Sequence, residues 1–469
     1  MKQLKDKRVL VLGIGETGLS MLRWLSVQGA RLRVADSRNA PPGMAEAGRY
    51  VAPGQIFCGG FTDALFDGID LIAISPGVPL RDPEVSKALA RGIPVAGDIE
   101  FFAQHLAASG CREAAKVIAI TGANGKTTVA SMVAHLCRAA GRDAVAAGNI
   151  SPAVLDALMA RGASLPEAWV LELSSFQLET TFNLNADAAA VLNVSEDHMD
   201  RYPGIDEYAA AKARIFQGGG VQVLNRDDAC SMRMALPGRE IVTFGLDKPR
   251  GGNDWGIDHA ADGVWLVRGS ERLLKTGELL VAGLHNAANA LAALALCRAI
   301  DLPMPALLDA LRSFKGLPHR VERVAEIDKV TYYDDSKGTN VGATIAALQG
   351  LGGKTVLIAG GEGKGQDFTP LCPVVAEHAR AVVLIGQDAP LIESALAGCG
   401  VGVVHAQGMK DAVQQASRLA QRGDAVLLSP ACASFDMFRN YVHRAEVFVQ
   451  AVHELDTACE PDKEGTWSR

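Results

Sequence analysis

Residues 117–141 read VIAITGANGKTTVASMVAHLCRAAG, and this stretch decides the fold. Its first four residues, 117–120, are all apolar and predict a buried parallel strand. After a short polar loop, apolar residues recur at helical spacing from Val129 to Leu136. A strand, a loop and a helix in this order are typical of an α/β domain that binds a ligand at the loop.

The loop of this stretch has the residues of a phosphate site. Gly122 and Gly125 let the backbone turn tightly with its N–H groups pointing inward, and the dipole of the next helix points to the same place. Lys126 adds a positive charge, and Thr127 adds a hydroxyl that can bind a phosphate-bound Mg²⁺. Ile120 stands where the common loop has a glycine, so this loop is a shorter form. We predict a nucleoside triphosphate site; a glycine-rich turn without a ligand is the alternative.

The composition indicates a large globular protein. A chain of 469 residues is long enough for about three domains, and its net charge of -7 gives no support for a general nucleic-acid binder. The nine cysteines lack Cys-x-x-Cys spacing, so neither a disulfide framework nor a zinc site is expected. A charged N-terminus and the lack of an apolar run of about 20 residues predict a cytoplasmic protein without a membrane span.

A second glycine loop lies near the N-terminus. Residues 8–12 predict a strand, and residues 13–18, GIGETG, fit the G-x-G-x-x-G pattern of dinucleotide-binding folds. Asp36 stands near the place of a ribose-binding acid, so an NAD-dependent dehydrogenase is one reading of this loop. The same glycines can hold any diphosphate against a helix N-terminus. Ser75, which follows the apolar strand 71–74, is either a ligand contact or a turn serine.

Polar side chains follow the strands downstream of the phosphate loop. Glu172 ends one apolar strand, and Asn193, Asp197 and His198 lie beyond the next. At strand ends beside a phosphate loop, such groups are candidate Mg²⁺ ligands or water-positioning residues. A hydrogen-bonded structural role is the alternative for His198. Lys212 lies in the helical pattern YAAAKARIFQ, where a solvated lysine is the simple interpretation.

The C-terminal part alternates apolar strands with helical patterns, which predicts another α/β unit with a parallel sheet. Its loops carry two lysines and several hydroxyls, which suit a small, doubly anionic ligand. We expect three domains: N-terminal Rossmann-like (1–112), central P-loop ATPase-like with a mostly parallel sheet (113–315) and C-terminal Rossmann-like (316–469). The polar tail from about Asp456 is predicted to be disordered.

Several longer motifs carry a resemblance to a known family. TGANGKTT is similar to the loop of the ATP-dependent amide ligases, which include the Mur ligases of bacterial peptidoglycan synthesis and the folylpolyglutamate synthases. The chain resembles the D-glutamate-adding branch of the Mur ligases in the motifs GDIE, ELSSFQLE, LNVSEDHMDRYP, GLPHRVE, DDSKGTN, GGEGKGQDF and LSPACASFD. The resemblance implies that ATP activates UDP-N-acetylmuramoyl-L-alanine as an acyl phosphate, which D-glutamate then converts to an amide. The partners that it implies are small molecules, namely the sugar nucleotide and D-glutamate. We expect a monomer.

The resemblance also implies the site residues. The catalytic residues would be Lys126, Glu172, His198 and Lys212. The ATP contacts would be Gly122, Ala123, Asn124, Gly125, Lys126, Thr127, Thr128, Asn286, Asn289, Arg320 and Asp335. The UDP-substrate contacts would be Thr17, Ser37, Arg38, Ser75, Asn149 and Gln177, and the D-glutamate contacts Lys337, Thr339, Lys364, Ser434, Phe435 and Tyr441. Two Mg²⁺ ions would be held by Thr127, Glu172, His198 and a carbamylated Lys212.

Three positions depart from the family pattern. The family usually has alanine where this chain has Gly338, glycine where it has Ser151 and phenylalanine where it has Tyr441. None of these differences removes a charge. Two alternatives stay open. Another Mur ligase or a folylpolyglutamate synthase would share the ATP site, although DDSKGTN speaks against both. A nicotinamide-dependent oxidoreductase would leave Lys126 unexplained.

Overall fold

The computed structural model describes residues 4–110, 112–113, 115–162, 164–281, 283–351 and 353–459, without the side chains of 456–459. Within this part of the chain the strands form three sheets, which contain five, nine and six strands in sequence order. Most neighbouring strands are parallel, and helices connect them, so the predicted α/β class is confirmed.

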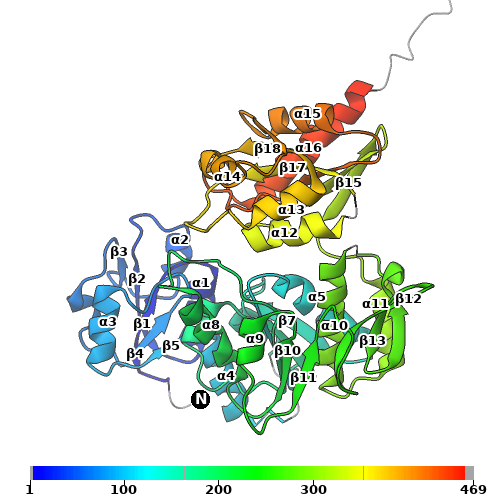
Figure 1. The fold of residues 1–469 in the computed structure, drawn as a ribbon. Coiled ribbons are helices and arrows are strands. Elements are labelled where there is room, and N and C mark those ends of the chain that lie inside the picture. Colours follow the sequence, from blue (N-terminus) through cyan, green and yellow to red (C-terminus); the bar gives the residue numbers. More distant parts are fainter. Residues whose placement is uncertain are drawn as a thin grey trace, which may run out of the picture. The chain divides into compact units, whose positions relative to one another are not determined.

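The first sheet is entirely parallel and has the order β3-β2-β1-β4-β5. Its strands are β1 (Arg8–Leu12), β2 (Arg31–Asp36), β3 (Ile56–Cys58), β4 (Leu71–Ile74) and β5 (Val95–Ala96). The helices are α1 (Glu16–Val27), α2 (Met44–Ala47), η1 (Asp63–Phe66), α3 (Pro83–Ala90) and α4 (Asp98–Ala108), and Figure 1 draws most of this region in blue. The connections change direction between β1 and β4, where open α/β sheets bind ligands at the carboxyl ends of the strands.

The second sheet has the order β14-β13-β12-β11-β10-β9-β6-β8-β7. Its parallel strands are β6 (Lys116–Thr121), β7 (Ala144–Gly148), β8 (Ala168–Glu172), β9 (Ala188–Val191), β10 (Val221–Asn225), β11 (Ile241–Phe244) and β12 (Trp255–Ala260). Two antiparallel strands follow, β13 (Gly263–Arg268) and β14 (Glu271–Lys275). The four strands β6 to β9 are buried almost throughout, which fixes the phosphate loop in a rigid frame.

Helices and short 3₁₀ turns lie between the strands of the second sheet and follow its last strand. They are α5 (Lys126–Ala139), α6 (Val154–Arg161), α7 (Ser175–Glu179), α8 (Ile205–Ala213), η2 (Arg214–Phe216), α9 (Ala229–Arg233), η3 (Thr276–Glu278), α10 (Leu284–Arg298) and α11 (Met304–Ser313). The helix α5 begins directly after the phosphate loop and packs against β6, β7 and β8. The predicted succession of strand, loop and helix in this stretch is therefore present.

The third sheet has the order β15-β16-β20-β17-β18-β19. Its strands are β15 (Glu322–Ile327), β16 (Val330–Asp334), β17 (Thr355–Gly360), β18 (Ala379–Ile385), β19 (Gly402–His405) and β20 (Ala425–Leu428). Its helices are α12 (Val341–Gly350), α13 (Leu371–His378), α14 (Ala389–Ala395), α15 (Met409–Leu419) and α16 (Tyr441–Cys459). The prediction of a parallel sheet is wrong for one pair of strands, because β15 pairs antiparallel with β16.

The helix α16 reaches Cys459, so the prediction of a disordered tail is wrong for residues 456–459. The rest of that predicted tail, 460–469, lies outside the described residues.

Close contacts divide the chain into two compact units. Unit 1 comprises 1–194, 206–276 and 289–312, and unit 2 comprises 195–205, 277–288 and 313–469. The first two sheets therefore belong to one unit, and the third sheet belongs to the other. The domain boundaries proposed from the sequence, at 112 and 315, stay a prediction.

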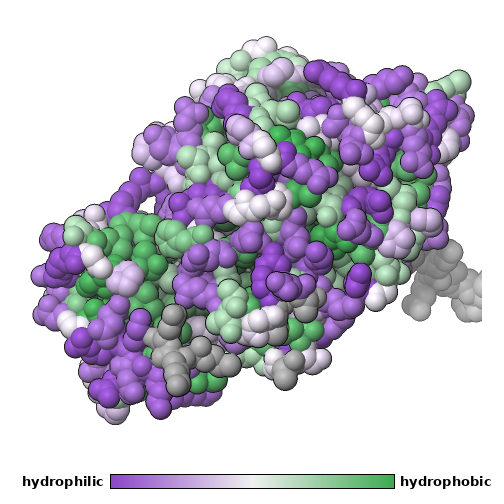
Figure 2. All heavy atoms as spheres, turned by 90° about the horizontal axis from the view of Figure 1, so that it is seen from below, coloured by the Kyte–Doolittle hydropathy of each residue, from purple (hydrophilic) through white to green (hydrophobic). Residues whose placement is uncertain are grey.

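Apolar side chains at the surface are scattered over many elements. Figure 2 shows hydrophobic areas lying among hydrophilic residues on the face that it draws. The most exposed large apolar side chains include Val27, Leu280, Leu391 and Phe435. Among the described residues, none of the helices combines the length and the apolar character that a membrane span requires.

Candidate active site

The phosphate loop of unit 1 turns at a glycine that no other residue could easily replace. Gly125 has a φ of +81°, a left-handed conformation that favours glycine. A Cβ atom at this position would lie 2.6 Å from Oδ1 of Asn289, an atom on α10. The loop is therefore closely flanked by the amide of Asn289, one of the residues predicted to contact ATP.

The lysine of the loop lies against the loop's own carbonyl groups. Nζ of Lys126 donates to the carbonyl oxygens of Gly122 and Ala123, both at 2.9 Å. A neighbouring side chain holds the same loop, because Asn193 accepts a 2.8 Å hydrogen bond from the Asn124 N–H and donates back to the Asn124 carbonyl. The loop is thus shaped by the protein itself, and it carries a cation at the N-terminus of α5.

Glu172 is a buried acid at the carboxyl end of β8, beside the phosphate-loop strand β6. Its side chain is 2% exposed. Oε1 accepts a 2.7 Å hydrogen bond from Nδ2 of Asn149, whereas Oε2 is buried without a hydrogen-bond partner among the described residues. A buried anionic oxygen without a partner is unfavourable. Mg²⁺ prefers oxygen ligands of this kind, so Glu172 fits the predicted ion.

Lys212 does not extend into solvent. Its side chain is only 1% exposed on α8, and Nζ donates a 2.9 Å hydrogen bond to the carbonyl oxygen of Gly122. The same nitrogen lies 4.2 Å from the ring centroid of Tyr208, one helical turn earlier. The interpretation of Lys212 as a solvated lysine is therefore wrong, and its amine lies at the start of the phosphate loop.

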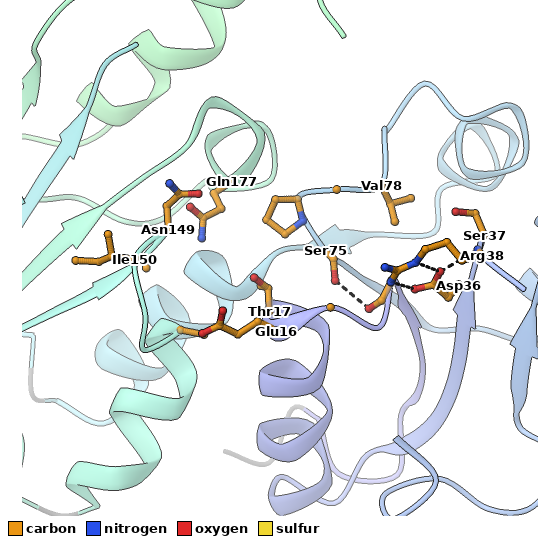
Figure 3. A pocket seen from close by; sticks show the side chains of 16 residues that line it. Glu16, Thr17, Asp36, Ser37, Arg38, Ser75, Val78, Asn149, Ile150 and Gln177 are labelled. Atoms are coloured by element: carbon orange, nitrogen blue, oxygen red, sulfur yellow. Dashed lines mark hydrogen bonds and ion pairs between the residues drawn. The ribbon is translucent and has the colours of Figure 1, made fainter. Parts of the chain in front are cut away.

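A pocket of about 490 Å³ lies in unit 1 and includes the first glycine loop. We call it the first-loop pocket; its lining includes Thr17, Ser37, Arg38, Ser75, Asn149 and Gln177. These are all six residues predicted to contact the UDP substrate, and they come from loops and helices that follow strands of both sheets of unit 1. Figure 3 shows Asn149 and Gln177 on one side of this pocket, Ser37 and Arg38 on the other, and Ser75 between them.

Asp36 shapes the first-loop pocket through several hydrogen bonds. One carboxylate oxygen accepts from the Ile14 N–H at 2.7 Å, and the guanidinium of Arg38 binds both oxygens at 2.8 Å (Figure 3). The hydrogen bond from Arg38 lowers the pKa of Asp36 to about 2. This acid thus holds the first loop and Arg38 together, which weakens the dehydrogenase interpretation, because that interpretation needs the carboxylate for a ribose.

Ser75 also binds the first glycine loop. Its Oγ donates a 3.0 Å hydrogen bond to the carbonyl oxygen of Gly13 (Figure 3). A Cβ atom on Gly18 would lie 2.8 Å from the same Oγ, so the start of α1 packs tightly against this serine. Ser75 therefore has a structural contact in addition to its place in the pocket.

In unit 2, two loops predicted to bind D-glutamate lie next to each other. Glu362 and Ala433 form an isolated antiparallel bridge, which brings the Lys364 loop beside the loop of Ser434. Nζ of Lys337 lies 3.8 Å from the ring centroid of Tyr441.

The other predicted residues of unit 2 have mixed surroundings. Nζ of Lys364 lies 3.3 Å from Oδ1 of Asp197, and Nε2 of His198 lies 3.6 Å from the other oxygen of that acid. Phe435 is 71% exposed, and its surroundings among the described residues of unit 2 do not test its predicted contact with D-glutamate. Asn286 is buried near the start of α10. His198 and Asn286 both belong to unit 2, so their places beside the phosphate loop stay predictions.

Sequence reasoning missed a buried arginine that joins these loops. Arg444 on α16 is 0% exposed. It donates to the Ser336 carbonyl and hydroxyl at 2.8 and 3.0 Å, and to the Cys432 carbonyl at 3.1 Å. The residue pattern of α16 indicates a helix but does not show that this charge is buried. Arg444 connects the loop of Lys337 to the loop of Ser434.

Arg444→Met should lower the free energy of unfolding and weaken the use of the D-glutamate that the family resemblance assigns to these loops. Each carbonyl that loses its partner costs about 1–3 kcal/mol. Urea unfolding measures the first effect, and KM for D-glutamate measures the second. Arg439→Met is the matched control, because Arg439 is exposed and its change should stay within about 0.5 kcal/mol. Equal stability of the two variants would contradict the role of Arg444.

Asp335 should make unit 2 less stable at high pH. Burial raises the pKa of its carboxyl from 3.8 to about 7, although Ser429 Oγ donates a 2.7 Å hydrogen bond to it. Since the folded-state pKa lies above that of the unfolded chain, stability is lost as the pH rises towards 7. Asp335→Asn should therefore raise the free energy of unfolding above pH 7, and the gain should shrink as the pH falls below 7. Urea unfolding across this pH range measures it, and a gain independent of pH would contradict the buried ionisation.

Fold and site together define a multidomain α/β enzyme that uses a nucleoside triphosphate. Three family models match separate parts of the chain: "Mur ligase MurD-like, N-terminal domain" at 7–97, "Mur ligase middle domain" at 120–297 and "Mur ligase, glutamate ligase domain" at 319–432. The chain belongs to the Mur ligase family.

Individual relatives cover almost the whole chain. The UDP-N-acetylmuramoylalanine–D-glutamate ligase of Methylobacillus flagellatus is 60% identical over 97% of this chain and 98% of its own length. The ligase of the same name from Nitrosospira multiformis is 57% identical over 97% of both chains. The solved structure of the UDP-N-acetylmuramate-alanine ligase of Thermotoga maritima has a TM-score of 0.59 at 20% identity, over 96% of this chain and 99% of that one. The last likeness supports the fold alone.

Proposed function

We propose that this chain joins D-glutamate to UDP-N-acetylmuramoyl-L-alanine with the hydrolysis of ATP to ADP and phosphate. The choice of substrates rests on the 60% identity to the UDP-N-acetylmuramoylalanine–D-glutamate ligase of Methylobacillus flagellatus, over nearly the whole length of both chains. The first-loop pocket supports it, because six residues assigned to the sugar nucleotide line one cavity. The alternatives of another Mur ligase or a folylpolyglutamate synthase would need a different amino acid or acceptor.

The reaction has two balanced steps. The L-alanyl carboxylate attacks the γ-phosphorus of ATP, and ADP leaves, which gives an acyl phosphate. The amine of D-glutamate then attacks the acyl carbon, loses a proton and expels inorganic phosphate. Both steps gather negative charge, so prepositioned cations should supply most of the catalysis.

Three residues of unit 1 are assigned to this chemistry. Lys126 would transfer its hydrogen bonds from the loop carbonyls to the β- and γ-phosphates. Glu172 would use its unpaired Oε2 for Mg²⁺, while Oε1 keeps its bond to Asn149. Mg²⁺, when bound, neutralises charge on the transferred phosphate. Lys212, in carbamylated form, would supply a second anion near Gly122.

Other assignments remain predictions that follow from the family. They include the role of His198 as a ligand of a second ion, and the ATP contacts of Asn286, Arg320 and Asp335. All four residues lie in unit 2. The expected cytoplasmic location and the monomeric state are predictions of the same kind.

Isotope transfer tests the acyl phosphate. UDP-N-acetylmuramoyl-L-alanine labelled with ¹⁸O in its carboxylate should give ¹⁸O in the phosphate that is released, because one labelled oxygen bridges carbon and phosphorus in the intermediate. Mass spectrometry of the phosphate and of the product measures this transfer. Product formation with unlabelled phosphate would contradict the proposed route.

A further inference from the structure

Asp98 is a buried acid beside the first-loop pocket that none of the assignments above uses. We infer that Asp98 is a positioning residue, which orients the amide of Gln177 so that one of its N–H groups faces the first-loop pocket. An acceptor oxygen of the sugar nucleotide, from a carbonyl or a carboxylate, would receive that hydrogen bond. The inference rests on the proposed function, because it names the partner of a residue in the substrate pocket.

The two side chains meet between the ends of two elements of unit 1. Asp98 is the first residue of α4 and is fully buried, and Gln177 lies in α7. Nε2 of Gln177 lies 3.1 and 3.3 Å from the two carboxylate oxygens of Asp98. Packing is tight here, since a Cβ atom on Gly97 would lie 2.4 Å from Oγ1 of the Thr180 side chain. The Asp98–Gln177 contact is therefore built into a tightly packed joint.

The other end of the Gln177 amide is held as well. Its Oε1 accepts from the backbone N–H of Ser174 at 3.1 Å, and the Ser174 hydroxyl caps α7 by accepting from the Gln177 N–H at 3.1 Å. If the amide were reversed, its NH₂ group would face the Ser174 N–H and its oxygen would face the Asp98 carboxylate. Both contacts would be repulsive, so the amide has one favourable orientation.

This orientation leaves one donor for a ligand. The two oxygens of a carboxylate lie close together, whereas the two N–H groups of an amide diverge, so both cannot point at Asp98. The remaining N–H belongs to a side chain that lines the first-loop pocket, next to Asn149 (Figure 3). Nδ2 of Asn149 already donates to Glu172. Each of these two amides therefore keeps one N–H for an acceptor oxygen, and the Asp98 contact decides where that of Gln177 points.

Asp98 must be ionised to impose this orientation, because a carboxylate only accepts hydrogen bonds. Burial raises the pKa of Asp98 to about 6, and the hydrogen bond from Gln177 opposes that rise. At pH 8 the carboxylate form therefore dominates, and binding is best compared there.

A double-mutant cycle on the full chain tests the inference. The variants are Asp98→Asn, Gln177→Ala and the double variant, and the measurement is the Kd of UDP-N-acetylmuramoyl-L-alanine by calorimetry without ATP. Asp98→Asn should weaken binding about tenfold, the usual effect of one good hydrogen bond, and Gln177→Ala should do about the same. The double variant should be no weaker than Gln177→Ala alone, because Asp98 acts through Gln177. The Kd of ATP should stay within about twofold in all three.

Glu100→Gln supplies the matched control for packing. Glu100 lies on α4 two residues after Asp98, is also buried, and accepts backbone N–H groups of Phe182 and Asn183 at 2.7 and 3.0 Å. The substitution of Glu100 disturbs the packing of α4 in the same region but leaves the contact between Asp98 and Gln177 in place. It should lower the melting temperature and leave the Kd of the sugar nucleotide unchanged.

Several outcomes would overturn the inference. Unchanged binding in Asp98→Asn would do so, as would an equal loss of binding in Glu100→Gln. A further tenfold loss in the double variant would show that Asp98 acts independently of Gln177. Failure of the proposed function would look different, because the unaltered chain would then bind no UDP-N-acetylmuramoyl-L-alanine at all.

Discussion

Lys126→Ala should abolish turnover and leave the fold intact. The Lys126 ammonium lies on the carbonyls of Gly122 and Ala123, at the N-terminus of α5, where it can follow the γ-phosphate as that group moves. Loss of one prepositioned donor to a developing charge commonly slows a reaction about 10²-fold or more. The loop itself should persist, because Asn193 and the left-handed Gly125 shape it independently. Steady-state phosphate release measures the loss, and thermal unfolding checks the fold.

Lys116→Ala is the matched control for Lys126. Lys116 begins the strand that leads into the same loop, and its exposed side chain pairs with Asp187 at 3.1 Å. This change should alter stability by about 0.5 kcal/mol at most and leave kcat unchanged. Near-normal turnover in Lys126→Ala would show that the loop has only a structural role.

Lys212→Ala should nearly eliminate activity. If the side chain carries a carbamate, the change removes an anion that would bind Mg²⁺. The buried position of the side chain, with Nζ 2.9 Å from the Gly122 carbonyl oxygen, would place such a carbamate beside the phosphate loop. Formate should partly restore turnover in Lys212→Ala by placing a carboxylate in the space that the side chain vacated, whereas a chloride salt of equal ionic strength should not.

Lys212→Met provides the comparison that isolates the anion. Methionine fills the space beside Tyr208, so this variant should be inactive and should not respond to formate. Both variants remove the Lys212 hydrogen bond to the Gly122 carbonyl, which keeps its hydrogen bond from Lys126, and thermal unfolding must show that both remain folded. Full activity of Lys212→Ala would rule out the role. The intact mass of an active enzyme supplied with bicarbonate would also rule it out if it showed only unmodified lysine.

The strands and loops near the phosphate site could be predicted because their signals are local. The strands 8–12 and 71–74 lie where short apolar runs placed them, and the phosphate loop lies between its predicted strand and helix. The strand β15 was missed, because ERVAEI lies at a sheet edge and most of its side chains are at least partly exposed. Such a strand has no apolar run to mark it.

Side chains whose partners are distant in sequence could not be placed. Alanines around Lys212 indicate a helix but not which face is buried, and its partner Gly122 lies 90 residues earlier. Asp98 and Gln177 are 79 residues apart, and Arg444 reaches Ser336 over 108 residues. Family motifs marked the six residues of the first-loop pocket, but neither spacing nor periodicity showed that they share one cavity.

The choice of amino acid is the most direct measure of the central claim. Phosphate release from ATP should be followed with UDP-N-acetylmuramoyl-L-alanine present and D-glutamate, L-glutamate, L-alanine or a diamino acid added in turn. The proposed function predicts that, of these amino acids, D-glutamate supports sustained phosphate release when the sugar nucleotide is present. Release should stop when either D-glutamate or the sugar nucleotide is left out, because the acyl phosphate forms on the sugar nucleotide and is discharged by the amine. Efficient release with L-glutamate or a diamino acid, and not with D-glutamate, would contradict it.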